Sequence, residues 1–254
     1  MIYYFSGTGN SKFAANKIGR ELNIKTISLN DNLKNEINFL DNELDDYLGF
    51  VFPTYDYDIP YVIKDYLKEI EIKNIKENTF VFSIFTCGEK TGSSYDTLNK
   101  ILKNKNIKLS SAYSIKMVDN SIPWFKPLTD EEKSNDLFKA NNYLDQIIVD
   151  LKNKKEIIKT DKKLNFLIKF LIDKFFVPTQ KKTKHFYVKD SCIGCGLCEK
   201  ICSMNCIEII DSKPKWNDNI CSACLSCLHR CPKEAIQYNK KTEKRVRYYN
   251  PYVD

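Results

Sequence analysis

A doubled cysteine pattern constrains this chain more than any other feature of its sequence. Nine of the ten cysteines lie between Cys192 and Cys231, and eight of them follow the spacing CxxCxxCxxxC twice, the second run displaced by 29 residues. The two runs are Cys192, Cys195, Cys198 and Cys202, then Cys221, Cys224, Cys227 and Cys231. Three thiolates at three-residue steps can surround one face of a cuboidal iron–sulfur cluster, whereas zinc generally uses two separated pairs of ligands. The spacing therefore predicts iron–sulfur clusters rather than zinc sites.

Residues 186–238 resemble bacterial two-cluster ferredoxins, and Cys231-Pro232 matches the terminal Cys-Pro of that family. Ser203 departs from the pattern, because the family usually has proline after the fourth cysteine of the first run. In these ferredoxins the fourth cysteine of each run ligates the other cluster. The resemblance thus implies a small α+β ferredoxin domain with two [4Fe-4S] clusters. The implied ligands are Cys192, Cys195, Cys198 and Cys231 for one cluster, and Cys221, Cys224, Cys227 and Cys202 for the second.

Two cysteines lie outside these ligand sets. The 29-residue displacement aligns Cys206 with Ala235, which favours a packing role over a fifth ligand or a redox switch. No histidine precedes His185, so for Cys87 we favour packing within a loop over a tuned catalytic thiolate. His185 and His229 are interpreted as surface or packing residues, because each cluster already has four thiolates.

The first 150 or so residues alternate short apolar runs with amphipathic stretches. This is the pattern of a doubly wound α/β sheet with helices on both faces. The predicted strands are residues 2–5, 24–29, 48–52, 80–86 and 111–117. The predicted helices are residues 11–22, 60–70, 93–105 and 130–153. The pattern predicts a five-stranded parallel sheet with right-handed crossovers.

Residues 6–11 join the first predicted strand to the first predicted helix. A helix N-terminus at the carboxyl end of a parallel strand is where open α/β sheets bind phosphate. The glycines permit close approach of the backbone, and the hydroxyl and amide side chains offer donors. The segment is neither a GxGxxG dinucleotide loop nor a Walker loop. The predicted phosphate site is Ser6, Gly7, Thr8, Gly9, Asn10 and Ser11.

This hexapeptide resembles the FMN-phosphate loop of flavodoxins, whose hydroxyl, Thr, Gly and hydroxyl positions it matches, and the resemblance covers about residues 1–150. It implies a flavodoxin-like domain that binds FMN and holds the flavin ring with the loops after the third and fourth strands, here residues 53–60 and 86–94. The candidate residues in these loops are Pro53, Thr54, Tyr55, Asp56, Tyr57, Thr86, Cys87, Gly88 and Glu89. Either tyrosine of the first loop, or Trp124, could stack on the ring.

The two resemblances together match, in order, a family of anaerobe ferredoxins with an N-terminal flavodoxin domain. The expected organisation is a flavodoxin-like domain at residues 1–155, a linker at 156–184, a ferredoxin-like domain at 185–240 and a basic tail at 241–254. We expect the basic stretch 240–247 to be a solvated face. Within the linker, residues 162–177 form an apolar helix with polar Asn165, Lys169 and Asp173 on one side, ended by Pro178. We favour a helix packed between the domains or in a homodimer contact over a membrane-surface anchor.

The resemblance implies an electron-transfer protein that passes electrons between FMN and two clusters and works with redox partner proteins. The alternative is an FMN-dependent reductase of a quinone, nitro compound or dioxygen that is fed through the clusters. The net charge of +7 would be offset in large part by thiolate-bound clusters and a flavin phosphate, and no nucleic-acid motif accompanies it. We expect no transmembrane segment, and the absence of a leader pattern predicts a cytoplasmic location.

Overall fold

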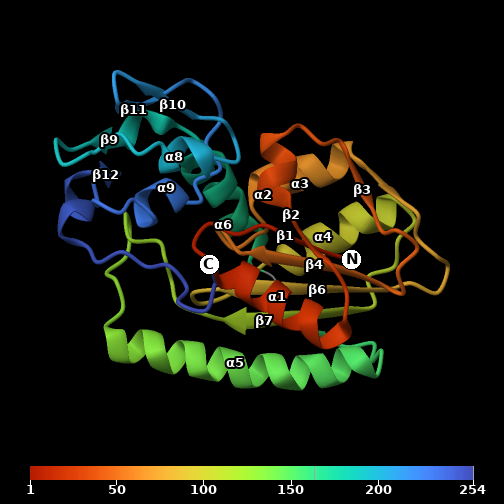
Figure 1. The fold of residues 1–254 in the computed structure, drawn as a ribbon. Helices are drawn as coiled ribbons and strands as arrows, with labels where there is room; N and C mark the ends of the chain where they lie inside the picture. The colour runs from red at the N-terminus through yellow and green to blue at the C-terminus, as the bar shows by residue number, and fades with distance from the viewer. Residues whose placement is uncertain (163, 254) are drawn as a thin grey trace.

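A parallel sheet forms the centre of the N-terminal part of the computed structural model, which describes residues 1–162 and 164–253 (Figure 1). In this described part the sheet runs in the order β2 (Thr26–Ser28), β1 (Ile2–Tyr4), β4 (Tyr47–Pro53), β6 (Phe80–Cys87), β7 (Ser111–Lys116) and β8 (Ile158–Lys159). Every neighbouring pair in it is parallel. Counted along the chain, the first five strands have the order 2-1-3-4-5 of flavodoxin-like folds. The predicted α/β fold is confirmed, and β8, from the expected linker, extends the edge beyond the five predicted strands.

Helices cover both faces of this sheet because successive strand residues point to opposite sides. On one face Phe13 and Ile18 pack with Val51 of β4, and on the other Ile63 and Leu98 pack with the next residue, Phe52. The helices of the first face are α1 (Asn10–Leu22) and α5 (Asp130–Lys152). Those of the second face are α2 (Leu29–Lys34), α3 (Tyr61–Glu69) and α4 (Ser94–Asn104). The start of α5 is fixed by a reciprocal capping box between Thr129 and Glu132.

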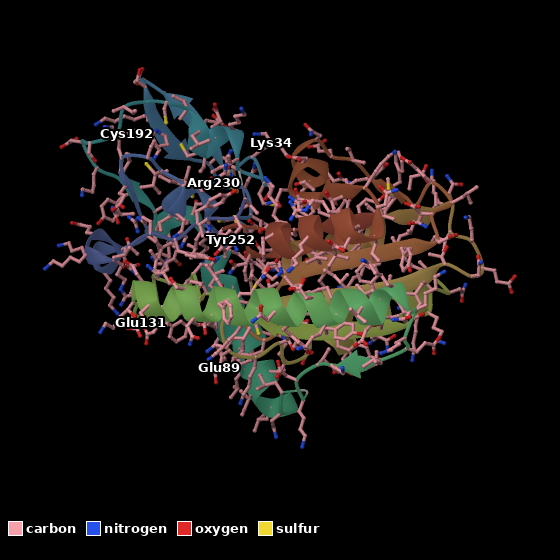
Figure 2. All side chains as sticks on the ribbon, turned by 60° about the horizontal axis from the view of Figure 1, so that its bottom comes forward. Lys34, Glu89, Glu131, Cys192, Arg230 and Tyr252 are labelled. Carbon is pink, nitrogen blue, oxygen red and sulfur yellow. The ribbon has the colours of Figure 1, made fainter. Side chains whose placement is uncertain are left out.

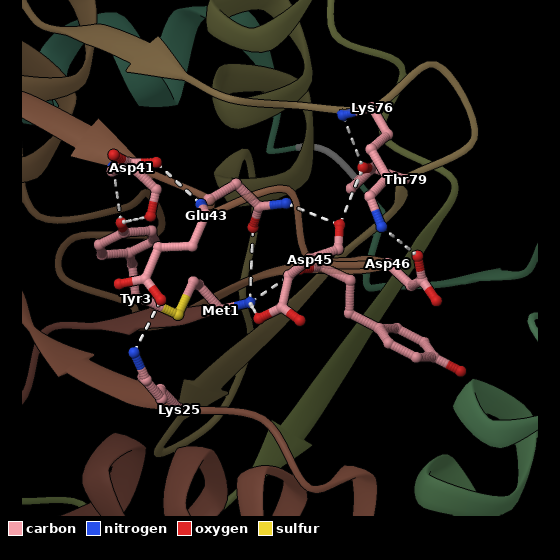
Figure 3. A network of polar contacts seen from close by, with 11 residues as sticks. Met1, Tyr3, Lys25, Asp41, Glu43, Asp45, Asp46, Lys76 and Thr79 are labelled. Carbon is pink, nitrogen blue, oxygen red and sulfur yellow. Dashed lines mark hydrogen bonds and ion pairs between the residues drawn. The ribbon is translucent and has the colours of Figure 1, made fainter.

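A polar network lies at the amino end of β1 (Figure 3), away from the loop that follows the strand. The amine of Met1 pairs with the Asp45 carboxylate at 2.8 Å. The Tyr3 hydroxyl donates to the Asp41 carbonyl at 2.7 Å and accepts from the Asp41 amide at 2.8 Å. Asp41 belongs to a small parallel pair of strands, β3 (Phe39–Asp41) and β5 (Glu71–Lys73). This network closes the end of the sheet that carries no predicted site residue.

The C-terminal domain is a small α+β unit with internal repetition. Its elements are β9 (Tyr187–Val188), α8 (Leu197–Lys200), β10 (Ile207–Ile210), β11 (Lys213–Trp216), α9 (Ser226–His229) and β12 (Ile236–Gln237). Strands β9 and β12 pair antiparallel, as do β10 and β11. The helix α9 follows α8 by the same 29 residues that separate the cysteine runs. Cys206 and its repeat partner Ala235 are 1% and 0% exposed, which agrees with the packing interpretation of Cys206.

The helix predicted in the linker runs through residues 166–180, and we call it the linker helix. It consists of α6 (Phe166–Leu171), a π-helical turn (Ile172–Phe176) and α7 (Val177–Gln180). The prediction that Pro178 ends this helix is wrong. Pro178 lies in the first turn of α7, where the hydrogen bonding changes from π to α and a missing N–H is tolerated. Lys163, inside the predicted range, lies outside the described residues.

Candidate functional site

One cavity of about 710 Å³ opens where the parallel strands end at their carboxyl termini. All three predicted flavin loops line it, as expected for an open α/β sheet. The predicted residues in its wall are Ser6, Gly7, Thr8, Asn10, Ser11, Pro53, Thr54, Tyr55, Asp56, Tyr57, Thr86, Cys87, Gly88 and Glu89. Gly9 is not in the wall, and its Cα faces Val253 and Asn250 instead. We call this space the flavin cavity.

The predicted phosphate loop is held in shape by its own side chains. The Ser6 hydroxyl accepts from the Gly9 amide at 3.1 Å, and the Ser11 hydroxyl meets that of Thr86 at 2.8 Å. Helix α1 begins with Gly9 in a left-handed conformation, φ 93°, and no side chain of the described residues caps it. A helix N-terminus without a side-chain cap is a place where proteins bind phosphate, so this end of α1 fits the predicted phosphate site.

The loop after β4, which is the predicted flavin loop of residues 53–60, makes a tight turn. Tyr55 and Asp58 exchange backbone hydrogen bonds of 2.8 and 3.0 Å, and Asp56 and Tyr57 between them have φ of 53° and 62°. Burial raises the pKa of the Asp56 carboxyl above its usual range. Both tyrosines and Trp124 line the cavity, so all three predicted stacking candidates lie around the same space.

Sequence reasoning missed part of the wall. The linker helix contributes Leu171, Ile172, Phe175 and Phe176, and the loop after β7 contributes Val118, Asp119, Asn120, Ser121 and Phe125 beside the predicted Trp124. The apolar run of the predicted helix was the available signal for the first group. Its polar side is fixed to the loop after β4: Lys169 pairs with buried Asp58 at 3.4 Å, and the Gln180 amide donates to Asp56 at 3.1 Å. The linker helix therefore turns apolar side chains toward the flavin cavity.

A second, smaller cavity lies in the C-terminal domain. Its wall includes the four residues implied for one cluster, Cys192, Cys195, Cys198 and Cys231, here called the distal cysteines, and it also includes Cys227. Its other walls include apolar Leu197, Ile201 and Ile209. Figure 2 shows Cys192 on the side of this domain, and Cys195 is exposed to solvent. In the described residues no three His, Cys, Asp or Glu side chains are placed to hold a single metal ion. Cysteine thiolates gathered around one space are the type of ligand that an iron–sulfur cluster requires.

The other four implied ligands, Cys202, Cys221, Cys224 and Cys227, are here called the proximal cysteines. Burial, and then the neighbouring Cys224 and Cys221 sulfurs, raise the pKa of the Cys227 thiol well above its usual range. Such crowding of buried sulfurs suits a cationic iron core that would hold them as thiolates. Backbone amides already point at two sulfurs of the repeat: Cys206 donates to Cys202 and Ala235 donates to Cys231, both at 3.3 Å.

The loop of proximal cysteines packs directly on the flavin cavity. Ala223 and Leu225 form part of the cavity wall. A Cβ on Gly7 would lie 2.3 Å from the Cys224 carbonyl oxygen, so the phosphate loop touches the backbone of a cysteine. The Tyr61 hydroxyl donates to the Cys221 carbonyl. Farther along the same interface, Lys34 donates to the Lys200 carbonyl at 2.6 Å. The two domains are thus joined at the site itself.

The C-terminal segment also returns to the phosphate loop, and Figure 1 shows it beside α1. The Asn250 amide donates to the Thr8 carbonyl at 2.9 Å, and the Tyr248 hydroxyl donates to the Asn10 side chain at 2.6 Å. Tyr248 and Asn250 are buried, so this end of the predicted basic tail is a packed segment. Lys241 and Lys244 belong to the basic stretch that we expected to be a solvated face, and both are exposed.

His229 connects this segment to the loop after β7. Its Nδ1 accepts from the Tyr248 amide at 3.0 Å, so its Nε2 carries the proton and donates to the Asn120 carbonyl at 2.8 Å. Burial lowers the pKa of His229 to about 4. The Asn120 side chain donates in turn to Thr8 at 2.6 Å. His229 is a packing residue, as predicted.

Replacing Asn10 with alanine tests whether these contacts hold the domains together. The Asn10 side chain donates to the Val118 carbonyl at 2.9 Å and accepts from Tyr248 and Asn250. Because these contacts are partly buried, we expect the free energy of unfolding to fall by about 2–3 kcal/mol in a urea titration. An unchanged unfolding midpoint would show that the C-terminal segment does not contribute to the fold.

Fold and site together define a flavodoxin-like domain joined to a ferredoxin-type iron–sulfur domain. The 4Fe-4S binding domain family matches residues 185–208. Subunit I of NADH-quinone oxidoreductase from Helicobacter pylori (strain Shi470) is 64% identical over 28 residues, which are 11% of this chain and 13% of that protein. The same subunit from Helicobacter hepaticus is 71% identical over 24 residues, 9% and 11% of the two chains. The chain thus spans about an eighth of the length of these curated relatives.

Solved flavodoxins resemble the N-terminal part. Oxidised flavodoxin 1 from Bacillus cereus is 14% identical with a TM-score of 0.33, over 57% of this chain and 95% of that one. A flavodoxin from the domain Archaea gives the same identity and TM-score over 59% and 97%. The fold assignment rests on strand order and not on these matches. Among the described residues no helix has the length and apolar character needed to cross a membrane.

Proposed function

We propose that this protein binds one FMN in the flavin cavity and two [4Fe-4S] clusters at the distal and proximal cysteines, and transfers electrons between them. The observation that carries the proposal is that Ala223 and Leu225, from the loop of proximal cysteines, line the cavity formed by the three flavin loops. When bound, the flavin supplies two-electron and one-electron chemistry, and each cluster exchanges one electron.

The positions of the cysteines give the three proposed cofactors an order, from the flavin cavity to the surface. The proximal cysteines hold their cluster against the flavin cavity, since Cys224 touches Gly7. The distal cysteines hold the other cluster farther from it, with Cys195 exposed at the surface. Phe175 and Phe176 of the linker helix give the cavity an apolar part of its wall. In this order the protein exchanges electrons with redox partner proteins at the distal cysteines. We propose that this exchange takes place in the cytoplasm.

A reductive titration tests the proposal. The purified protein, kept anaerobic, is reduced stepwise with dithionite while the flavin and cluster absorbance bands are followed. We expect about four electrons per chain, two for FMN and one for each cluster. Uptake of only two electrons, with no bleaching of cluster absorbance, would contradict it.

The double change Ser6→Ala and Thr8→Ala tests the phosphate loop. The Ser6 hydroxyl holds the Gly9 amide, and the Thr8 hydroxyl accepts from Asn120. Losing both loosens the anion site, so we expect FMN to bind at least about tenfold more weakly, which is about 1.4 kcal/mol. Flavin fluorescence titration measures this, and iron content is expected to stay unchanged. Unaltered FMN affinity would remove the loop from the site.

A reductase of a small substrate is the second candidate. It is favoured by Asp56, a carboxyl in the cavity wall whose pKa burial raises, because a proton donor beside the flavin is what such an enzyme needs. Cys87 does not offer a nucleophile, because burial raises the pKa of its thiol to about 12. Saturable turnover of a quinone, nitro compound or dioxygen that falls in Asp56→Asn would favour the reductase over the carrier.

The exposed side of the linker helix is relevant to whether two copies of this chain form a dimer. Leu167 and Ile168 are 63% and 51% exposed, and Phe170 is 48% exposed. Such a group of apolar side chains supports a homodimer contact as part of the proposal. Sedimentation of the purified protein decides between monomer and dimer.

A further inference from the structure

Tyr55 occupies the boundary between the flavin cavity and the proximal cysteines. It lines the flavin cavity and also a smaller adjoining cavity whose wall includes Ser222 and Ala223. Its ring meets Phe5 edge-on with centroids 6.5 Å apart. Tyr55 and Cys224 both pack against the same apolar core of the N-terminal domain. The side chain therefore reaches from a flavin loop to the cluster loop.

The hydroxyl of Tyr55 is buried and has no hydrogen-bond partner among the described residues. The backbone of Tyr55 is fully paired with Asp58, so the unpaired group is the side chain alone. A buried hydroxyl without a partner costs about 1–3 kcal/mol, and native proteins keep few of them. A group bound at this boundary is expected to supply the missing acceptor.

The neighbours of the hydroxyl indicate which group that is. Ser222 and Ala223, which share the adjoining cavity with Tyr55, stand between Cys221 and Cys224 in the loop of proximal cysteines. The Cys221 carbonyl accepts from Tyr61, and the Cys224 carbonyl lies against Gly7, and neither is a hydrogen-bond partner of the Tyr55 hydroxyl among the described residues. The sulfur atoms of a cluster held by these cysteines would offer acceptors to the Tyr55 hydroxyl on this side.

We propose that the Tyr55 hydroxyl donates a hydrogen bond to a sulfur atom of the cluster held by the proximal cysteines, which makes Tyr55 the residue that couples this cluster to the flavin cavity. The inference rests on the proposed function. Hydrogen bonds to cluster sulfurs stabilise the more negative, reduced cluster and raise its reduction potential. Tyr55 thus sets how readily the cluster next to the flavin accepts an electron.

The change Tyr55→Phe tests this inference because it removes the hydroxyl and keeps the ring. Iron, sulfide and FMN are counted first, and each cofactor is then titrated potentiometrically with EPR and absorbance. The signal that survives in Cys195→Ala identifies the proximal cluster. We expect its reduction equilibrium to become about tenfold less favourable, about 59 mV for one electron, with the distal cluster and FMN unchanged. If Tyr55→Phe does not fold, Tyr55→Met also lacks the hydroxyl and is expected to give the same shift.

The matched control is Tyr3→Phe, which removes a hydroxyl bonded to Asp41 at the other end of the sheet. It is expected to lower stability and to leave all three potentials unchanged. A shift of the FMN potential alone in Tyr55→Phe, or no shift in any potential, would overturn the inference while the proposed function stands. Purified protein without iron and sulfide would overturn the proposed function and the inference with it.

Discussion

Replacing Cys224 with alanine is expected to remove one cluster and to weaken FMN binding at the same time. Iron should fall from about eight to about four per chain, since one [4Fe-4S] cluster is lost. The flavin is affected because the Cys224 carbonyl packs on Gly7 of the phosphate loop, and Ala223 and Leu225 form part of the cavity wall. Loss of the cluster frees this loop, so we expect at least about a tenfold loss of FMN affinity, about 1.4 kcal/mol.

Cys195→Ala is the matched control for this experiment. Cys195 belongs to the distal cysteines, is exposed, and does not line the flavin cavity among the described residues. The same loss of about four iron is expected, but FMN affinity should stay at its original value. Iron analysis and flavin fluorescence titration measure both variants. Equal FMN affinity in the two variants would mean that the loop of proximal cysteines does not shape the flavin cavity.

Gly7→Ala is expected to have the second large effect. The new methyl group would lie 2.3 Å from the Cys224 carbonyl oxygen and 3.1 Å from the Cys224 Cβ. Because the obstacle is backbone, the two domains must move apart, and we expect a loss of about 1–3 kcal/mol in the free energy of unfolding together with weaker FMN binding. A urea titration and a flavin titration follow the two quantities.

Gly196→Ala separates this clash from the general cost of replacing glycine. Gly196 has φ +72°, but no atom of the described residues lies within 4 Å of an added Cβ. Its replacement is expected to cost about 1–2 kcal/mol from backbone conformation alone, with FMN affinity retained. If Gly7→Ala binds FMN as tightly as Gly196→Ala does, the contact between the phosphate loop and Cys224 has no role in the site.

The parts of the fold that sequence predicts are those fixed by local pattern. The buried runs of β4 and β6 are largely apolar, with Ser83 and Thr86 as the polar residues of β6, and such runs are typical of parallel strands covered on both faces. The short strand β8 at the edge of the sheet could not be predicted in this way. It consists of two exposed residues, Ile158 and Lys159, whose pairing with β7 depends on the course of the chain after α5. Nothing in their own sequence marks them as a strand.

The residues of the candidate site also divide into those that a local pattern predicts and those that it does not. Ser6 and Ser11 stand in a spacing that glycine turns and helix N-termini require, so they were predictable from sequence. Phe175 was identified only as apolar, because a helix period shows which side is buried and not which cavity it meets. Tyr248 and Asn250 were missed, since their partners Asn10 and Thr8 lie about 240 residues earlier and no local pattern records such a contact.

The measurement that tests the central claim most directly is an anaerobic absorbance spectrum of the purified protein, with iron, acid-labile sulfide and flavin quantified per chain. The account predicts about eight iron, about eight sulfide and about one FMN. Zinc without sulfide, or no flavin after reconstitution with FMN, would contradict it.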